Sequence, residues 1–437
     1  MPAASRPITH RRVLHIAVPI VISNATIPIL GAVDTGVVGQ LGEAAPIGAV
    51  GIGAIILTSI YWVFGFLRMG TTGLVAQARG AGDAAETGAL LMRGLMIAAA
   101  AGLVFIVSQA AVFWAAFELA PASAEVEDLA RDYLAIRIWG APAAIGVYAL
   151  TGWLIAMERA GAVLALQVTM NGVNVVLDLL FVLGFGWGVE GVAVATLIAE
   201  WSGLAFGVWL CRAAFAGDQW RDWPRVLDRA RLKRMAQVNG DILIRSVILQ
   251  ASFTSFLFLG AGLGDVTLAA NQVLLQFVQI SAFALDGFAF AAEALVGQAL
   301  GAHARPDLRR AAILTSQWGF GFAVALAAVF IAFGPLLIDI MTTAPDVRLA
   351  SRAYLPWVVA MPVLGIAAWM LDGIFIGATR TRDLRNAMAV SAAIYAATLA
   401  LLLPTLGNHG LWASLIVLNI ARAVTLGLRY PRLEAAA

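Results

Sequence analysis

Long apolar runs separated by short polar clusters dominate the chain. The runs reach about 20 residues or more and lack the alternation of barrel strands, so they predict helices long enough to cross a bilayer. A helix also satisfies its own backbone hydrogen bonds in lipid. We therefore expect an all-α membrane protein with twelve transmembrane helices at residues 13–39, 47–70, 88–117, 133–156, 163–184, 190–211, 236–261, 266–296, 310–338, 353–377, 386–405 and 410–429.

A sequence repeat divides these helices into two sets of six. Three stretches recur at a spacing of 221 positions: 75–81 (VAQARGA) as 296–302 (VGQALGA), 131–134 (RDYL) as 352–355 (RAYL), and Gly152 as Gly373. Each copy has six spans, an even number, so both copies begin on the same side of the membrane. A pseudo-twofold axis along the membrane normal therefore relates the two bundles. We expect an N-terminal lobe at 1–215, a linker loop at 216–235 and a C-terminal lobe at 236–437.

Basic residues indicate the orientation. Most of the 28 Lys and Arg residues fall on one side of the membrane, in the N-terminal tail, in the loop 212–234 and around the other loops of that side, and Arg93 and Arg422 are counted on this side. The opposite loops carry mostly acids. The positive-inside rule then places both termini in the cytoplasm and the protein in a bacterial-type cytoplasmic (inner) membrane.

Composition and motifs exclude several classes of protein. With 61% hydrophobic and 12% charged residues, the chain is unlike a soluble domain. Four histidines and the single Cys211 supply neither a metal cluster nor a disulfide framework, and no GxxxxGK[ST] motif exists. We expect no enzyme and no catalytic residues, no cofactor or metal, and no nucleic-acid partner.

Ionisable residues inside predicted spans are functional candidates, because hydrocarbon penalises them. In the first half these are Asp34 and Asp178, with Asn174 one turn before Asp178 on the same helix face. Thr196 and Tyr133 fall at a similar depth. A lone carboxyl group could serve only helix packing, but two at one depth beside an amide and two hydroxyls predict a proton or cation site.

The first span contains two prolines as well as this aspartate. Pro19 and Pro28 each remove a backbone donor ahead of Asp34. Proline kinks often serve packing alone, but here a bend at Pro19 coupled to protonation is a reasonable hypothesis. In general, a carboxyl group in a dry cavity tends to hold a proton and to release it when water enters, which is what an antiporter requires.

The second half has its own set of ionisable residues within spans: Arg245, Asp286, Glu293 and Asp372. We expect Arg245 to pair with Glu293 or Asp372, because an unpaired guanidinium there would cost about 2.5–3.5 kcal/mol. Arg137 and Glu200 also fall within spans, without an evident partner, and for them we expect snorkelling or structural pairing.

Several motifs resemble the multidrug and toxic compound extrusion (MATE) family. In the first half they are Pro19–x14–Asp34–x4–Gly39, YLxxRxxGxP from Tyr133 to Pro142, and NxxxD at Asn174 and Asp178. In the second half, LAANQ (268–272), LDGFAFAAEALVGQALGA (285–302) and LDGIFIGATRTRDLRNAM (371–388) are similar to its DinF-type subfamily. The resemblance covers nearly the whole chain.

The resemblance implies two six-helix lobes forming a V around a central cavity, and cation-driven export of amphipathic, often cationic compounds. The proton site of DinF-type members matches these residues, with the bend at Pro19: Asp34, Asn174, Asp178, Thr196 and Tyr133. Leu30 stands where some members have a tyrosine, so this hydrogen-bond network is expected to differ. In sodium-linked relatives the cation site lies in the C-terminal lobe, where Asp372 occupies a comparable place.

We therefore expect a monomeric multidrug antiporter that exchanges drug-like, cationic amphipathic compounds for protons and contacts membrane lipid. The alternatives are a sodium-coupled exporter of the same family and a flippase for lipid-linked precursors. A flippase would line its cavity with basic residues, whereas the deep charges here are five acids to one arginine, which favours cations. A membrane-embedded enzyme would need a nucleophile or a metal cluster.

Overall fold

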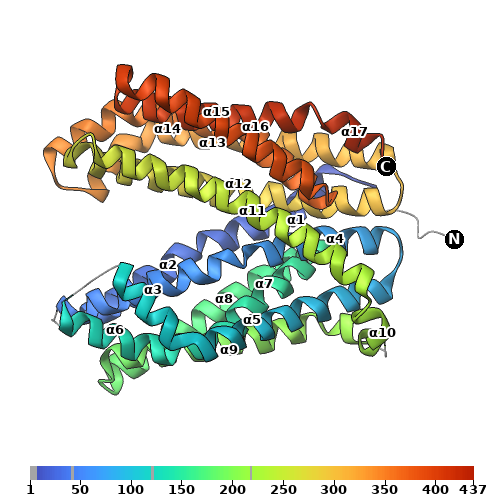
Figure 1. Ribbon diagram of the computed structural model, residues 1–437, viewed down its shortest axis with the longest axis horizontal. Coiled ribbons are helices and arrows are strands. Elements are labelled where there is room, and N and C mark those ends of the chain that lie inside the picture. Colours follow the sequence, from blue (N-terminus) through green and yellow to red (C-terminus); the bar gives the residue numbers. More distant parts are fainter. Residues whose placement is uncertain (1–6, 41–43, 120–122, 217–218) are drawn as a thin grey trace. The chain divides into compact units, whose positions relative to one another are not determined.

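The computed structural model describes residues 7–40, 44–119, 123–216 and 219–437, and within these ranges the chain is helical with no strand (Figure 1). The α-helices are α1 (His10–Ala25), α2 (Ile27–Gly39), α3 (Ala44–Val63), α4 (Gly65–Gly80), α5 (Ala84–Leu119), α6 (Ala124–Arg137), α7 (Ala141–Ala156), α8 (Ala160–Asp178), α9 (Gly188–Leu210), α10 (Trp223–Val226), α11 (Arg229–Ala261), α12 (Asp265–Gly301), α13 (Arg305–Met341), α14 (Pro345–Gly377), α15 (Thr381–Leu406), α16 (Asn408–Gly427) and α17 (Tyr430–Glu434). Shorter turns are η1 (Ile138–Gly140), η2 (Leu179–Gly184, a π-helix), η3 (Arg212–Phe215) and η4 (Gln219–Arg221). The predicted all-α class is confirmed.

Eleven stretches in the described part of the chain, single helices or directly joined ones, are long and apolar enough to cross a membrane. They correspond in order to the second to twelfth predicted spans. The first predicted span is divided instead into α1 and α2 at Thr26. Pro28 explains the division, because it lacks the N–H that would bond one turn back and it disfavours helical geometry at Ile27. Helix α1 runs without interruption through Pro19.

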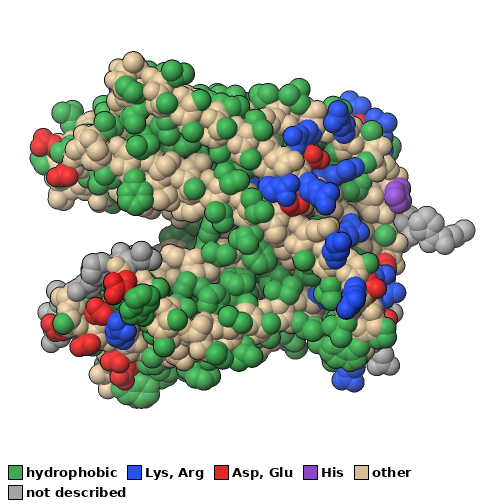
Figure 2. All heavy atoms as spheres, in the orientation of Figure 1, with side chains coloured by type: hydrophobic (Ala, Val, Ile, Leu, Met, Phe, Trp, Pro, Cys, Tyr) green, Lys and Arg blue, Asp and Glu red, His purple; other side chains and the backbone are tan. Residues whose placement is uncertain are grey.

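The chain forms two compact units. Unit 1 comprises Met1–Val21, Ala76–Gly82 and Arg234–Ala437, and unit 2 comprises Ile22–Val75 and Asp83–Lys233. In each unit Lys and Arg side chains gather at one end, some of them beside acidic ones, whereas the other end shows acidic side chains with few basic ones (Figure 2). This separation of charge along each unit is what a membrane-spanning bundle with a basic cytoplasmic end requires.

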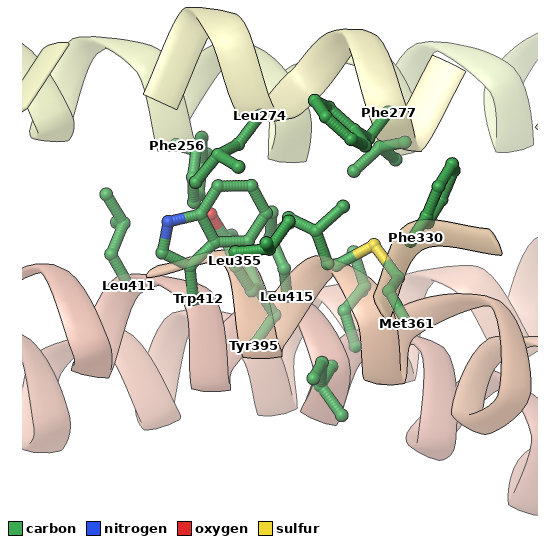
Figure 3. Packing of buried hydrophobic residues seen from close by; sticks show 14 of the residues in the cluster. Phe256, Leu274, Phe277, Phe330, Leu355, Met361, Tyr395, Leu411, Trp412 and Leu415 are labelled. Atoms are coloured by element: carbon green, nitrogen blue, oxygen red, sulfur yellow. The ribbon is translucent and has the colours of Figure 1, made fainter. Parts of the chain in front are cut away.

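The core of unit 1 is built from large apolar side chains of α11 to α16 (Figure 3). Phe256 meets the edge of Trp412, with ring centroids 4.7 Å apart, and Phe277 meets Phe330 at 5.1 Å. The indole nitrogen of Trp412 donates to Asn271 over 2.9 Å. The buried tryptophan therefore has a polar partner within the apolar cluster, as a buried N–H group requires.

The sequence repeat is visible as a repeated helix crossing. In unit 2 a Cβ atom at Gly152 would lie 2.4 Å from the carbonyl oxygen of Arg68, and in unit 1 a Cβ at Gly373 would lie 2.5 Å from that of Ala289. Arg68 and Ala289 are separated by the same 221 positions as the two glycines. The same close approach of two backbones, possible only with glycine, thus occurs once in each unit.

The two copies of the VxQxxGA motif meet inside unit 1. A Cβ at Gly80 would lie 2.0 Å from the carbonyl oxygen of Gln298, and a Cβ at Gly301 would lie 2.0 Å from that of Gln77. The amide of Gln77 also donates to Thr379 over 2.9 Å. The C-terminal ends of α4 and α12 therefore cross in direct backbone contact, which explains why both copies keep glycine.

The segment 212–235 is anchored to α5. Arg93, counted above on the basic side of the membrane, is buried within α5. Its guanidinium donates to the carbonyl oxygens of Val226 and Arg225 over 2.8 and 2.6 Å and pairs with Glu86 at 2.7 Å. Arg225 in turn pairs with Asp83 at 3.0 Å. Part of the basic charge in this region therefore holds the linker in place.

Candidate cation site and charged networks

The two carboxyl groups predicted for the first half lie together in unit 2. Asp34 is half-buried on α2, and Asp178 is fully buried at the last residue of α8, where the chain continues into the wider turn of the π-helix η2. Helix α2 packs against α8, and the two carboxyl groups are close enough to interact electrostatically. π-helical turns are frequently found at functional sites, and this one ends the span Ala160–Gly184 directly after Asp178.

Asn174 and Thr196 complete the polar surface beside Asp178. The Asn174 amide donates to the Thr196 hydroxyl over 3.0 Å, and that hydroxyl donates to the carbonyl oxygen of Val192 over 2.9 Å. Both carboxyl oxygens of Asp178 and the side-chain oxygen of Asn174 are buried and accept no hydrogen bond from the described residues. Three buried acceptor atoms at one place suit a proton or a small cation.

A cation contributed by the protein lies in the same cluster. Arg137, buried at the end of α6, forms an ion pair with Glu200 of α9, with 2.8 Å between Nη1 and Oε1. Its guanidinium lies 5.9 Å from the centre of the Tyr133 ring and interacts electrostatically with Asp34 and Asp178. The structure thus brings Tyr133, Asp34 and Asp178 within electrostatic reach of one arginine.

Sequence reasoning placed Arg137 and Glu200 outside the site. The expected structural pairing is found, but the two residues pair with each other and stand beside the aspartates. Arg137 was the fifth position of the YLxxRxxGxP motif, and this position carried the available signal. Because Arg137 forms its ion pair with Glu200, no salt bridge among the described residues neutralises the carboxyl groups of Asp34 and Asp178.

In unit 1 one carboxylate lies between two arginines. Asp372 of α14 forms ion pairs with Arg245 of α11 and Arg422 of α16, and the three side chains are at most 9% exposed. Arg422 also donates to Asn419 over 2.9 Å. Arg245 therefore has Asp372, one of its two expected partners. Arg422, counted above on the basic side of the membrane and within the last predicted span, is buried inside α16.

Asp286 and Glu293, the other predicted members of this network, lie on α12. Glu293 is buried and Asp286 half-buried, and each makes interactions of its own. A further buried acid, Asp241 of α11, accepts hydrogen bonds from Arg385 over 2.6 Å and from Thr381 over 3.1 Å. In the described parts of the chain no group of three His, Cys, Asp or Glu residues could hold a metal ion.

Apolar membrane-spanning helices that enclose buried charged clusters define an integral membrane protein of the transporter class. The chain matches the MatE family model over residues 19–180 and 242–402, and it belongs to the MatE family. It is 38% identical to the DNA damage-inducible protein F of Escherichia coli (strain K12) over 427 residues, which cover 96% of this chain and 91% of that protein. The predicted resemblance to this family and subfamily is confirmed.

More distant relatives extend the comparison. The chain is 27% identical to a probable multidrug resistance protein NorM of Synechocystis sp. (strain ATCC 27184 / PCC 6803 / Kazusa), covering 83% of this chain and 79% of that protein. A solved structure described as the outward-facing conformation of a multidrug resistance MATE family transporter of the MOP superfamily matches with a TM-score of 0.86. It covers 98% of this chain and 96% of that chain at 19% identity, and this likeness concerns the fold.

Proposed function

We propose that the protein is a secondary multidrug exporter that exchanges cationic amphipathic compounds for protons. Its relatives include a protein named for multidrug resistance, and the family contains transporters. The observation that carries the proton assignment is the pair of carboxyl groups of the half-buried Asp34 and the buried Asp178, with buried oxygen atoms that accept no hydrogen bond from a described residue. Transport of this kind is not enzyme chemistry.

The proton is held at this pair in the proposed mechanism. Two carboxylates at one buried place repel each other, and uptake of a proton removes the repulsion. Asn174 donates a hydrogen bond to Thr196 beside the pair, and this bond fixes the orientation of both polar side chains. Tyr133 and Arg137 set the local field. Substrate binding then favours the charged pair, and protonation favours the empty carrier.

Helix movement couples the proton to transport. We propose that protonation of Asp34 bends the first span into the substrate path, with Pro19 as the bending point. The division of this span at Thr26 lies between Pro19 and Asp34, so α2 is able to move separately from α1. An ion shifts an equilibrium only through its different affinity for the two states, so the residue that changes charge must be the one that couples.

A sodium-coupled mechanism through unit 1 is less well supported. Asp372 would be its natural ligand, but this carboxylate already lies between Arg245 and Arg422. The two guanidinium groups that pair with this carboxylate offset its negative charge and so weaken its attraction for Na⁺. A structural role therefore suits the ion pairs of Asp372 better.

The orientation and organisation of the chain belong to the proposal. We propose lobes at 1–215 and 236–437 joined by the linker 216–235, both termini in the cytoplasm of a bacterial cytoplasmic membrane, and a monomer as the working unit. The basic end of each unit supports this orientation (Figure 2). A flippase is disfavoured because the cluster in unit 2 has three carboxyl groups for one guanidinium, which attracts cations.

Efflux from proteoliposomes tests the coupling ion. Purified protein is reconstituted with a fluorescent cationic amphipath inside, and a proton gradient or a sodium gradient is imposed separately. We expect the proton gradient alone to drive efflux above the rate of protein-free vesicles. Efflux driven only by the sodium gradient would refute proton coupling and make Asp372 the candidate residue for binding the coupling ion.

A further inference from the structure

Two adjoining cavities follow the outer surface of α13 in unit 1. The first, of about 560 Å³, is lined by Arg305, Pro306, Arg309, Arg310, Ile313, Leu314 and Glu434. The second, of about 460 Å³, is lined by Ala312, Ile313, Ser316, Gln317, Phe320, Leu371, Ile374 and Tyr430. Ile313 belongs to both, so together they form one groove, here called the α13 groove, with a basic end and an apolar end.

The basic end is lined by more arginines than acids. Three arginines line it against one acid, and Glu434 of α17 pairs with Arg305 at 3.4 Å. Arg309 and Arg310 are both exposed, and Arg309 interacts electrostatically with the hydroxyl group of Tyr430. Lys and Arg side chains gather at the end of this unit where the C-terminus of the chain lies (Figures 1 and 2). This end therefore suits an anion.

The apolar end continues in the direction of the membrane interior. Helix α13 is a candidate span, and on it Ile313 and Phe320 are 46% and 51% exposed. From Arg309 to Phe320 the helix rises by roughly 16 Å, which is about half the thickness of the hydrocarbon core. A molecule with its charge at the arginines would thus reach along the groove into one leaflet of the bilayer.

We propose that the α13 groove is a binding site for an anionic phospholipid. The phosphate lies against Arg309 and Arg310, and one acyl chain lies over Ile313 and Phe320. Guanidinium groups bind phosphate through paired, charge-assisted hydrogen bonds, and basic pockets at the cytoplasmic ends of membrane helices suit anionic headgroups. A zwitterionic lipid would lose this charge complementarity, and a free anion would leave the apolar half of the groove unused.

The groove also borders α14, the helix that carries Asp372. Leu371 and Ile374 line the groove from α14, and Asp372 lies between them in sequence on the buried side of that helix. A lipid in the groove covers the helix that carries the ion pairs. Since a ligand that binds only the folded state stabilises it, bound anionic lipid should raise the thermal stability of the protein.

Lipid titration of the delipidated full-length protein in detergent tests the proposal. Binding of phosphatidylglycerol and of phosphatidylcholine with the same acyl chains is counted by native mass spectrometry. The test variant is the double substitution Arg309→Ala and Arg310→Ala, and the control is Arg380→Ala with Arg382→Ala. The control removes two exposed arginines from the same unit that do not line the groove.

We expect the wild type and the control to prefer phosphatidylglycerol, and the test variant to bind it about thirty-fold more weakly, since each basic residue contributes about 1 kcal/mol at an anionic surface. Ile313→Ser should weaken lipid binding while both arginines remain. Equal losses in the control and the test variant, or no preference between the two lipids, would overturn the proposal. If inorganic phosphate alone raises the melting temperature of the protein as much as phosphatidylglycerol does, the groove is a free-anion site instead. Because no gradient or substrate is involved, these outcomes are independent of the transport mechanism.

Discussion

Replacing Asp372 with asparagine should destabilise unit 1 strongly. Asp372→Asn keeps the size of the side chain but removes the charge that both Arg245 and Arg422 contact. The three side chains are at most 9% exposed, so water cannot take over the lost interactions. Removing one partner of a buried ion pair typically costs about 3–5 kcal/mol, because the remaining charge stays buried and uncompensated.

The size of the effect should depend on which residue is removed. Arg245→Ala and Arg422→Ala each leave Asp372 with one arginine, so each should cost less than Asp372→Asn, which leaves two arginines without it. At about 2–4 °C per kcal/mol for a unit of this size, Asp372→Asn should lower the melting temperature by at least about 6 °C.

Thermal unfolding of the detergent-purified variants measures this order of stabilities. The unfolding is monitored by size-exclusion chromatography of heated samples. Arg382→Ala, which removes an exposed arginine in the same unit, is the control and should melt within about 1 °C of the wild type. A melting temperature for Asp372→Asn equal to that of the wild type would refute the structural role. An arginine variant that stays stable but no longer transports would instead assign the cluster to a gate or a substrate site.

Two further predictions follow from the helix crossing and from the charge distribution. Gly301→Ala should destabilise the protein by about 1–3 kcal/mol in thermal unfolding, because its Cβ would lie 2.0 Å from the carbonyl oxygen of Gln77, whereas Gly321→Ala, with open space around it, should not destabilise it. A membrane-impermeant thiol reagent on intact cells should label a cysteine at Ser123 and not one at Arg229, both exposed positions, and labelling only at Arg229 would reverse the orientation.

The native cysteine does not interfere with that labelling experiment. Cys211 follows the last residue of α9 and is fully buried. Burial raises the pKa of its thiol to about 12, so at neutral pH it remains protonated and is a poor nucleophile. The wild-type protein therefore serves as the unlabelled background.

Hydrophobic pattern and repeat predict most of this fold. Eleven of the twelve expected spans correspond to helices of the described residues, because hydrocarbon allows few alternatives to a helix of about 20 apolar residues. The first span differs because a local effect, the backbone geometry that Pro28 imposes, divides a run that is apolar throughout. Hydropathy alone does not register such a break.

The charged sites were predictable in part. Asp34 and Asp178 were recognisable because each is an acid within an apolar run, and depth along the helices placed them together. Arg422 was missed because it lies near a span end, where sequence alone cannot separate a snorkelling arginine from a buried one. The partners Arg137 and Glu200 come from α6 and α9, and their pairing depends on how those helices pack.

The most direct test of the proposed mechanism is proton-driven efflux by the Asp34→Asn protein in proteoliposomes. Asparagine is close in size to aspartate but cannot take up or release the coupling proton. We expect the purified variant to melt near the wild-type temperature and still to bind the cationic substrate, but to show no transport against a substrate gradient when a proton gradient is imposed. Uphill, proton-driven efflux by Asp34→Asn at the wild-type rate would contradict the account and place the proton site elsewhere.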